Sequence, residues 1–278
     1  MTNFIGVEYS RGATAKIVEG GPALGPAAVQ EMFPGANWTM ISSAPVDAAE
    51  CMADRFGDAF EIHKKIYSAT PDTRHILIGG DHSVNFGHFA ALADQMPDED
   101  LCLIYIDAHL DIHTPESSQS EASGAPHGTN VRANLGEGDA RWLSLQSKFP
   151  ALRPENLFYL ASRSYEPSEI AFVRENGIFM RTADSLQTDG DLDDAITEIR
   201  RRLDGRPFVV SFDFDAIDPQ YFKDVLVPEP AGISMYAARR LTREFADAHS
   251  FEYVEYAPTG DAAAQVAVRE LVGIVANQ

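Results

Sequence analysis

Short apolar runs that alternate with amphipathic segments dominate this sequence. Eight runs have the character of strands, at residues 3–9, 37–42, 74–80, 101–107, 156–162, 177–180, 207–215 and 251–257. Between several of them apolar residues recur at steps of three and four, as in helices; examples are residues 48–68, 83–96, 193–203 and 234–248. Strands that alternate with helices favour a parallel sheet covered on both faces. We therefore expect an α/β three-layer sandwich with a mostly parallel sheet of roughly eight strands.

Length and composition favour one soluble domain. The chain has 278 residues, 45% of them hydrophobic, which suffices for one large core. Because no internal repeat or Ser/Gly-rich linker interrupts it, we expect a single domain over residues 1–278. The sequence has no long apolar stretch and no signal-like N-terminus, so we expect a cytoplasmic protein. Two cysteines, Cys51 and Cys102, make a disulfide framework unexpected.

The chain is strongly acidic. It carries 42 acidic and 22 basic residues, a formal net charge of −20. Such a charge argues against nucleic acid or an anionic membrane as a partner. A cationic substrate or metal ions suit it better, although most acidic residues outside the motifs below are expected on the solvated surface.

Asp and His side chains directly follow three of the predicted strands. They are Asp81 and His82 after the third run, Asp107, His109 and Asp111 after the fourth, and Asp213, Asp215 and Asp218 after the seventh. In an extended segment alternate side chains share one side, so each group could converge on one point. The carboxyl ends of parallel strands are where α/β proteins bind ligands. Long segments without periodicity, at about 108–126 and 218–232, follow two of these strands and are typical of functional loops.

Taken together, these residues predict a metal site. A single Asp at a strand end is often a helix N-cap, but several carboxylates at buried strand ends would repel one another unless cations neutralised them. Two imidazoles with four carboxylates contain too much oxygen for structural zinc and too much nitrogen for calcium or magnesium. Manganese fits best. Six ligands suit two ions about 3.5–4 Å apart that share a water able to ionise near neutral pH.

Several motifs resemble those of the ureohydrolases, the family of arginase, agmatinase and their relatives. They are GGDHS at 79–83, DAHLD at 107–111, SGAPHG at 123–128 and SFDFDAIDP at 211–219, with VEGGP at 18–22 and VEYAP at 254–258. This similarity extends over nearly the whole chain. It implies a parallel α/β fold and a hydrolase with two Mn²⁺ ions.

The resemblance also assigns roles to individual residues. One ion would take His82, Asp107, Asp111 and Asp213, and the other His109, Asp107, Asp213 and Asp215, with Asp107 and Asp213 as bridges. Asp111 would also orient the attacking hydroxide, and His127 would shuttle a proton to the leaving amine. Glu255 would pair with the guanidinium of the substrate, since a carboxylate can accept two parallel hydrogen bonds from that planar cation.

The rim of the predicted pocket departs from the arginase pattern. Arginases usually read DINTP, SGNxHG and RDVDPxE, and this chain reads DIHTP, SGAPHG and RSYEPSE. Ser123 is retained, His113 replaces an Asn, and Glu166 stands where an amino-binding Asp would be; we expect all three to bind substrate. Val227 replaces a threonine near the guanidino end, which removes a hydrogen bond worth roughly 0.5–1.5 kcal/mol.

The sequence thus predicts a Mn-dependent amidinohydrolase that releases urea from L-arginine or a close analogue. The alternatives within the family are agmatine, guanidino acids such as guanidinobutyrate and guanidinopropionate, and formimino-glutamate. A zinc amide deacetylase is disfavoured because GGDHS has one His and Asp111 suits a second ion. An inactive homologue would have no use for His127. The expected partner is a small cationic guanidino substrate, and the resemblance implies a homo-oligomer, a trimer or hexamer.

Overall fold

The computed structural model describes residues 2–13 and 21–277, and it contains a single eight-stranded sheet. The strands are β1 (Asn3–Glu8), β2 (Asn37–Ser42), β3 (His75–Ile78), β4 (Cys102–Ile106), β5 (Leu157–Ser162), β6 (Phe179–Thr182), β7 (Phe208–Asp213) and β8 (Ser250–Val254). Their order in the sheet is β2-β1-β3-β8-β7-β4-β5-β6, and every neighbouring pair is parallel. The predicted parallel sheet of about eight strands is confirmed.

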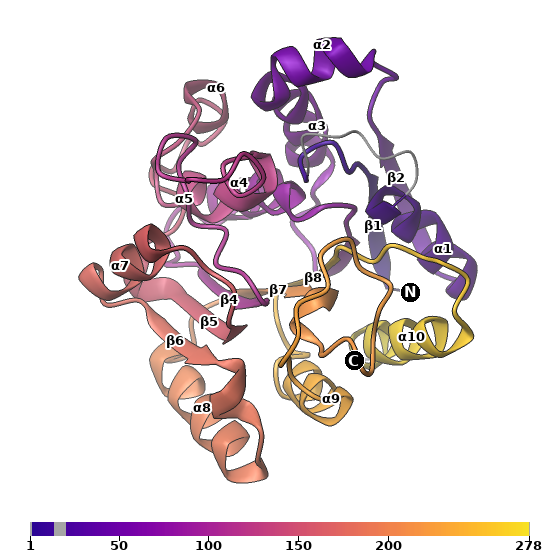
Figure 1. Cartoon of the computed structure of the whole chain (residues 1–278), viewed down its shortest axis with the longest axis vertical. Coiled ribbons are helices and arrows are strands. Elements are labelled where there is room, and N and C mark those ends of the chain that lie inside the picture. Colours follow the sequence, from indigo (N-terminus) through magenta and orange to yellow (C-terminus); the bar gives the residue numbers. More distant parts are fainter. Residues whose placement is uncertain (1, 14–20, 278) are drawn as a thin grey trace.

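Helices cover both faces of the sheet (Figure 1). On one face lie α1 (Gly25–Met32), α8 (Asp189–Leu203), α9 (Met235–Glu244) and α10 (Ala262–Ala276). On the other lie α3 (Arg55–Ala69), α4 (Asn85–Gln95), α5 (Asn130–Asn134), α6 (Ala140–Leu143) and α7 (Pro167–Glu175). None of the helices in the described part of the chain has the length and hydropathy needed to cross a membrane.

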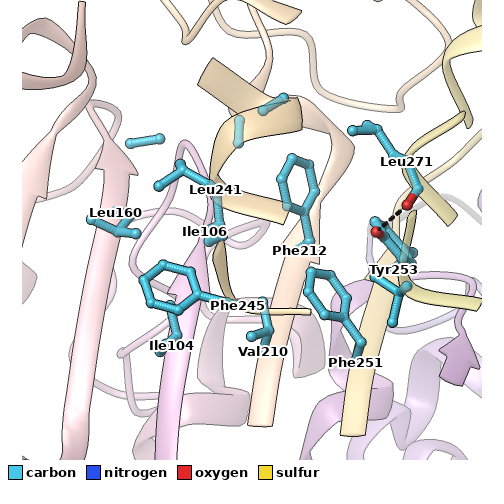
Figure 2. Close-up of a cluster of buried hydrophobic side chains, with 14 of the residues drawn as sticks. Ile104, Ile106, Leu160, Val210, Phe212, Leu241, Phe245, Phe251, Tyr253 and Leu271 are labelled. Carbon is cyan, nitrogen blue, oxygen red and sulfur yellow. Dashed lines mark hydrogen bonds between the residues drawn. The ribbon is translucent and has the colours of Figure 1, made fainter. Parts of the chain in front are cut away.

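The alternation of side chains along each strand separates the two cores. Ile104, Val210 and Phe251 point toward α9 and α10, as Figure 2 shows, whereas the intervening Leu103 and Val209 face α4 and α5. Both sets are buried, which explains why these strands are apolar at almost every position.

The chain crosses the middle of the sheet between β3 and β4, which are consecutive in sequence but not adjacent in the sheet. It passes over two positions that β8 and β7 fill later, so the carboxyl ends of β3, β8, β7 and β4 lie side by side. In open parallel sheets a ligand crevice forms where neighbouring strands are followed by helices on opposite faces, as β3 is by α4 and β8 by α10. The segments that follow these four strands carry the GGDHS, VEYAP, SFDFD and DAHLD motifs.

The structure refines the expected elements at a few places. The amphipathic segment 48–68 is divided into α2 (Ala48–Ala53) and α3, because the Asp54 side chain accepts a hydrogen bond from the Gly57 amide and caps α3. The long loops after β4 and β7 are present as expected. Residues 18–20 of the VEGGP motif lie outside the described residues.

Gly80 offers a test of how the end of β3 is packed. A Cβ at this position would lie 1.8 Å from the carbonyl oxygen of Tyr9, so one of the two backbone segments would have to move. We expect Gly80→Ala to lower the free energy of unfolding by about 1–3 kcal/mol, the usual effect of overpacking, as measured by urea denaturation. Gly35→Ala is the matched control, because nothing lies within 4 Å of its added Cβ. Equal effects of the two substitutions would contradict this packing.

Candidate functional site

The six Asp and His residues predicted as metal ligands lie together at the carboxyl ends of β3, β4 and β7. Nδ1 of His82 is 2.8 Å from Oδ2 of Asp107, 3.2 Å from Oδ2 of Asp213 and 3.5 Å from Oδ2 of Asp111. Nδ1 of His109 is 3.0 Å from Oδ2 of Asp215 and 3.4 Å from Oδ1 of Asp107. Asp107 thus turns one oxygen toward each histidine, and the ligand-type atoms form two adjoining clusters that share it.

The backbone conformation that brings these six side chains together differs from the one we expected. The residues after β4 and β7 form turns rather than extended segments. Oδ1 of Asp107 accepts a hydrogen bond from the His109 amide at 2.6 Å, and Oδ1 of Asp213 accepts one from the Asp215 amide at 2.7 Å. Asp111 has a φ of 49°. The predicted proximity is correct, but the proposed alternation along an extended strand is wrong.

Two other acidic residues of these motifs accept hydrogen bonds from nearby backbone amides. Asp81 accepts hydrogen bonds from the amides of Gly12 and Ser83. Asp218 accepts them from the amides of Gln220 and Gly232 and so closes the loop after β7. Neither residue belongs to the two clusters.

The two clusters have the chemistry of a cation site. Nδ1 of His82 and Oδ2 of Asp107 are buried and face each other at 2.8 Å, but within the part of the chain that the structure describes neither atom makes a hydrogen bond of acceptable geometry. Burial, followed by the charge of Asp107, raises the pKa of Asp111 to about 7. Burial and the neighbouring Asp215 and Asp107 raise the pKa of Asp213 well above its usual range. Without cations the clusters would therefore hold protons, and their oxygen and imidazole donors fit divalent ions such as Mn²⁺.

Glu255 follows β8 and lies beside the clusters. Its φ of 64° is unusual for a residue with a side chain. Oε1 accepts a hydrogen bond from the His82 amide at 3.0 Å, while the buried Oε2 has no partner among the described residues. Burial, and next the charge of Asp81, raise its pKa well above the usual range. A cationic group that hydrogen-bonded to Oε2 would stabilise the ionised form.

His127 is held in one tautomer by the backbone. Its Nδ1 lies 2.9 Å from the carbonyl oxygen of Gly12, and because a carbonyl can only accept, Nδ1 carries the proton. Burial lowers the pKa of His127 to about 4. The ring is therefore neutral at physiological pH, and Nε2 is free to accept a proton.

A cavity of about 330 Å³ joins these parts. It is lined by every predicted catalytic and substrate-binding residue and by all the predicted metal ligands except Asp107, which lies beneath them. The polar lining also includes Ser164, Glu169 and Glu229.

The three predicted rim residues lie in the cavity wall, but two of them have structural contacts as well. Glu166 immediately precedes α7 and accepts hydrogen bonds from the Ser118 hydroxyl and the Gln119 amide, at 2.9 and 3.0 Å. His113 is buried, and its Nε2 lies 3.3 Å from Oε2 of Glu169 and 3.5 Å from Oε1 of Glu166. Although burial opposes it, this pair of carboxylates raises the pKa of His113. Ser123 lines the same wall.

Sequence reasoning missed Glu229 and Arg163. Oε1 of Glu229 lies 3.7 Å from Nε2 of His109, so this carboxylate adds to the charge around the cluster. Arg163 donates hydrogen bonds to the carbonyls of Asp215, Glu229 and Pro230 and ties the loop to the end of β7. The acidic side chain within the loop segment VPEPAGIS, residues 227–234, could have indicated Glu229, whereas contacts of Arg163 with carbonyls leave no sequence pattern.

Tyr105 was also missed because it lies within an apolar strand. Its ring stacks on that of His82, with centroids 4.3 Å apart and planes 7° apart. Its hydroxyl donates to Oδ2 of Asp111 at 2.7 Å. Tyr105 thus fixes the position of two residues of one cluster.

Comparison with known proteins identifies the family. The family model described as "Arginase family" matches residues 3–277. The arginase of Bacillus caldovelox is 28% identical over 281 residues, which covers 93% of this chain and 91% of that protein. The solved structure of Entamoeba histolytica arginase in complex with L-ornithine has a TM-score of 0.84 at 22% identity, covering 99% of this chain and 97% of that one. Formimidoylglutamase of Bacillus subtilis has a TM-score of 0.75 at 18% identity, covering 100% and 87%.

The fold and the match over nearly the whole chain define an α/β protein of the ureohydrolase class. The chain belongs to the arginase family. The predicted family is confirmed, and with it the prediction of a hydrolase that acts on amidino groups.

The environment of His127 predicts its behaviour with pH. Since its pKa in the folded protein is about 4, and that of an unfolded chain is about 6.5, only the unfolded state takes up the proton between these values. His127 should therefore be neutral, with its proton on Nδ1, from about pH 5 to 8, and its contribution to stability should fall as the pH drops from about 6.5 to 4. Nitrogen-15 NMR of the histidine rings measures both the tautomer and the titration. A doubly protonated His127 at pH 6 would contradict this environment.

Proposed function

We propose that this protein is a Mn-dependent amidinohydrolase that releases urea from the guanidino group of L-arginine or a close analogue. The observation that carries the proposal is the pair of Asp/His clusters that share Asp107. In the same cavity they adjoin Oε2 of Glu255, which has no partner among the described residues. The first feature suits two cations, and the second suits a planar cationic group.

Two Mn²⁺ ions would be held by the six ligands assigned above. His82, Asp107, Asp111 and Asp213 would hold one, and His109, Asp107, Asp213 and Asp215 the other. Bound there, the ions would supply Lewis acidity that lowers the pKa of water to near neutrality. The two orientations of the Asp107 oxygens support its role as a bridge. The two clusters also favour this reading over a deacetylase with a single zinc ion.

The residues of the chain would orient the reactants and move the proton. Glu255 would accept hydrogen bonds from the guanidinium and hold its carbon next to the clusters. Asp111, itself fixed by Tyr105, would align the attacking water. His127 would transfer a proton through Nε2 to the leaving amine, while the bond from Nδ1 to Gly12 keeps its ring in place.

The distal end of the cavity favours an amino-acid substrate. Glu166 would bind an α-ammonium group, and His113 and Ser123 would bind the rest of the amino-acid part. Agmatine, guanidino acids and formimino-glutamate are the alternatives, because they share the reacting group and differ at this end. The single domain, the cytoplasmic location and the homo-oligomeric assembly stay predictions.

A urea-release assay with added Mn²⁺ tests the proposal directly. Arginine, agmatine, guanidinobutyrate and guanidinopropionate are compared at equal concentration. We expect release from arginine to be fastest. No release from any of them would overturn the proposed function.

Metal content tests the assignment of ligands. His82→Asn should lose mainly one ion per chain because His109 still serves the other, whereas Asp107→Asn should weaken both. His127→Ala is the control: it should keep both ions and lower turnover by about 10²–10⁴-fold, the usual contribution of acid–base catalysis. Elemental analysis of the purified variants measures the first two effects. Loss of manganese in His127→Ala would make His127 a ligand.

Glu166→Gln tests the substrate class. If the carboxylate binds an α-ammonium group, the substitution should weaken arginine binding by roughly 1–3 kcal/mol, because a charge-assisted hydrogen bond is lost. Hydrolysis of guanidinobutyrate, which has no α-amino group, should change far less. Glu166 also holds residues 118 and 119, and a shift of that loop would affect both substrates. The measurement is therefore the ratio of kcat/KM for arginine to that for guanidinobutyrate. An unchanged ratio would favour guanidino acids as substrates.

A further inference from the structure

A group of polar side chains is buried between α4 and the sheet, outside the cavity. His75 on β3, Ser211 on β7 and Glu252 on β8 occupy the face that α4 covers, and Asn85 and His88 come from α4 itself. Each of the five is at most 1% exposed. None of them lines the cavity, and the proposed mechanism uses none of them. Burial of so many polar groups has an energetic cost unless each is hydrogen-bonded.

The hydrogen bonds of this group fix where its protons lie. Nδ1 of His75 lies 2.8 Å from the carbonyl oxygen of Thr73, so Nδ1 carries the proton and Nε2 accepts. Nε2 of His88, 2.7 Å away, must then donate to it. Nδ1 of His88 hydrogen-bonds to Oε1 of Glu252. Whichever of these two atoms holds the shared proton, Oε2 of Glu252 remains an acceptor.

The second oxygen of Glu252 leads to the metal cluster. Oε2 accepts hydrogen bonds from the amide of Asn85 at 2.8 Å and from the hydroxyl of Ser211 at 2.5 Å. Because the Ser211 hydroxyl donates its only proton to Glu252, its oxygen must accept the hydrogen bond from Nε2 of His82, which lies 2.8 Å away. This places a proton on Nε2 of His82, so Nδ1, which faces Asp107 and Asp213, is the ring atom left to bind a metal ion.

We propose that Glu252, held by His88 and His75, is a positioning residue that acts through Ser211 to keep His82 in the tautomer able to bind a metal ion through Nδ1. This inference rests on the proposed function to the extent that His82 is a ligand. A ligand histidine that donates its second N–H is both oriented and made more basic. The hydrogen-bonded chain His75–His88–Glu252–Ser211–His82, which we call the relay, extends that effect from the carboxyl edge of the sheet to the start of β3, where His75 lies.

Substitutions at Glu252 separate positioning from general stability. Glu252→Leu removes the acceptor, so the Ser211 hydroxyl can turn and donate to Nε2 of His82, which favours the wrong tautomer. Glu252→Gln keeps an acceptor oxygen for Ser211 and an N–H for a neutral His88. Tyr253→Phe is the matched control, since it removes another buried hydrogen bond of β8, to the Leu271 carbonyl, on the opposite face.

The readout is the affinity of the metal-stripped protein for Mn²⁺, measured by calorimetry. We expect Glu252→Leu to bind the ion of the His82 cluster about 10–100-fold more weakly, the usual effect of losing such an outer partner. Glu252→Gln should restore most of the affinity, and Tyr253→Phe should match the wild type. Wild-type affinity in Glu252→Leu, or equal losses in Glu252→Leu and Tyr253→Phe, would overturn the proposal.

Nitrogen-15 NMR of the wild-type chain tests the relay without any substitution, in case Glu252→Leu does not fold. We expect the proton of His75 on Nδ1 and a proton on Nε2 of His88, both in slow exchange with water. We also expect a proton on Nε2 of His82; its absence would overturn the relay, because Ser211 would then donate to His82 rather than to Glu252. If the wild type did not bind Mn²⁺, the proposed metal centre would be wrong. The NMR measurement would still show whether the hydrogen bonds of the relay exist.

Discussion

Repulsion among buried carboxylates is the interaction on which the architecture of the site depends. Asp107, Asp213 and Asp215 are at most 4% exposed and lie around the same two histidines. Two unit charges 4 Å apart interact by roughly 4 kcal/mol at the effective dielectric constant of a protein, about 20. A chain that folds with such a cluster must neutralise it with protons or with cations. The raised pKa values of Asp111 and Asp213 describe the first case, and two divalent ions would provide the second.

The rest of the structure holds these charges in place. The insertion of β8 and β7 between β3 and β4 makes four loops meet at one edge of the sheet. The backbone is left-handed at Asp111 and Glu255, two residues that line the cavity. Such conformations persist where surrounding contacts determine them, here the bonds from Tyr105 to Asp111 and from the His82 amide to Glu255.

The charge of the cavity agrees with the proposed substrate class. Four glutamates, Glu166, Glu169, Glu229 and Glu255, belong to its lining, and among the described lining residues there is no Lys or Arg. A substrate with a guanidinium at one end and an ammonium at the other would meet carboxylates at both ends. His113 is the group of this wall that could face an anion, and it already lies within 3.5 Å of Glu166 and Glu169.

The sequence by itself determined the parallel sheet, the strand ends that carry chemistry and the identity of the six clustered residues. These follow from local patterns, since a strand buried on both faces is apolar at almost every position and a charged residue after it marks the exit from the core. Only the tertiary structure decided how the six residues converge, because turns at Asp107 and Asp213 set their directions. It also revealed Tyr105, Arg163 and the relay from His75 to Ser211. The relay depends on partners as much as 167 positions apart along the chain, as in the bond from Asn85 to Glu252. Contacts over such separations form only when the strands are assembled, so no local sequence pattern predicts them.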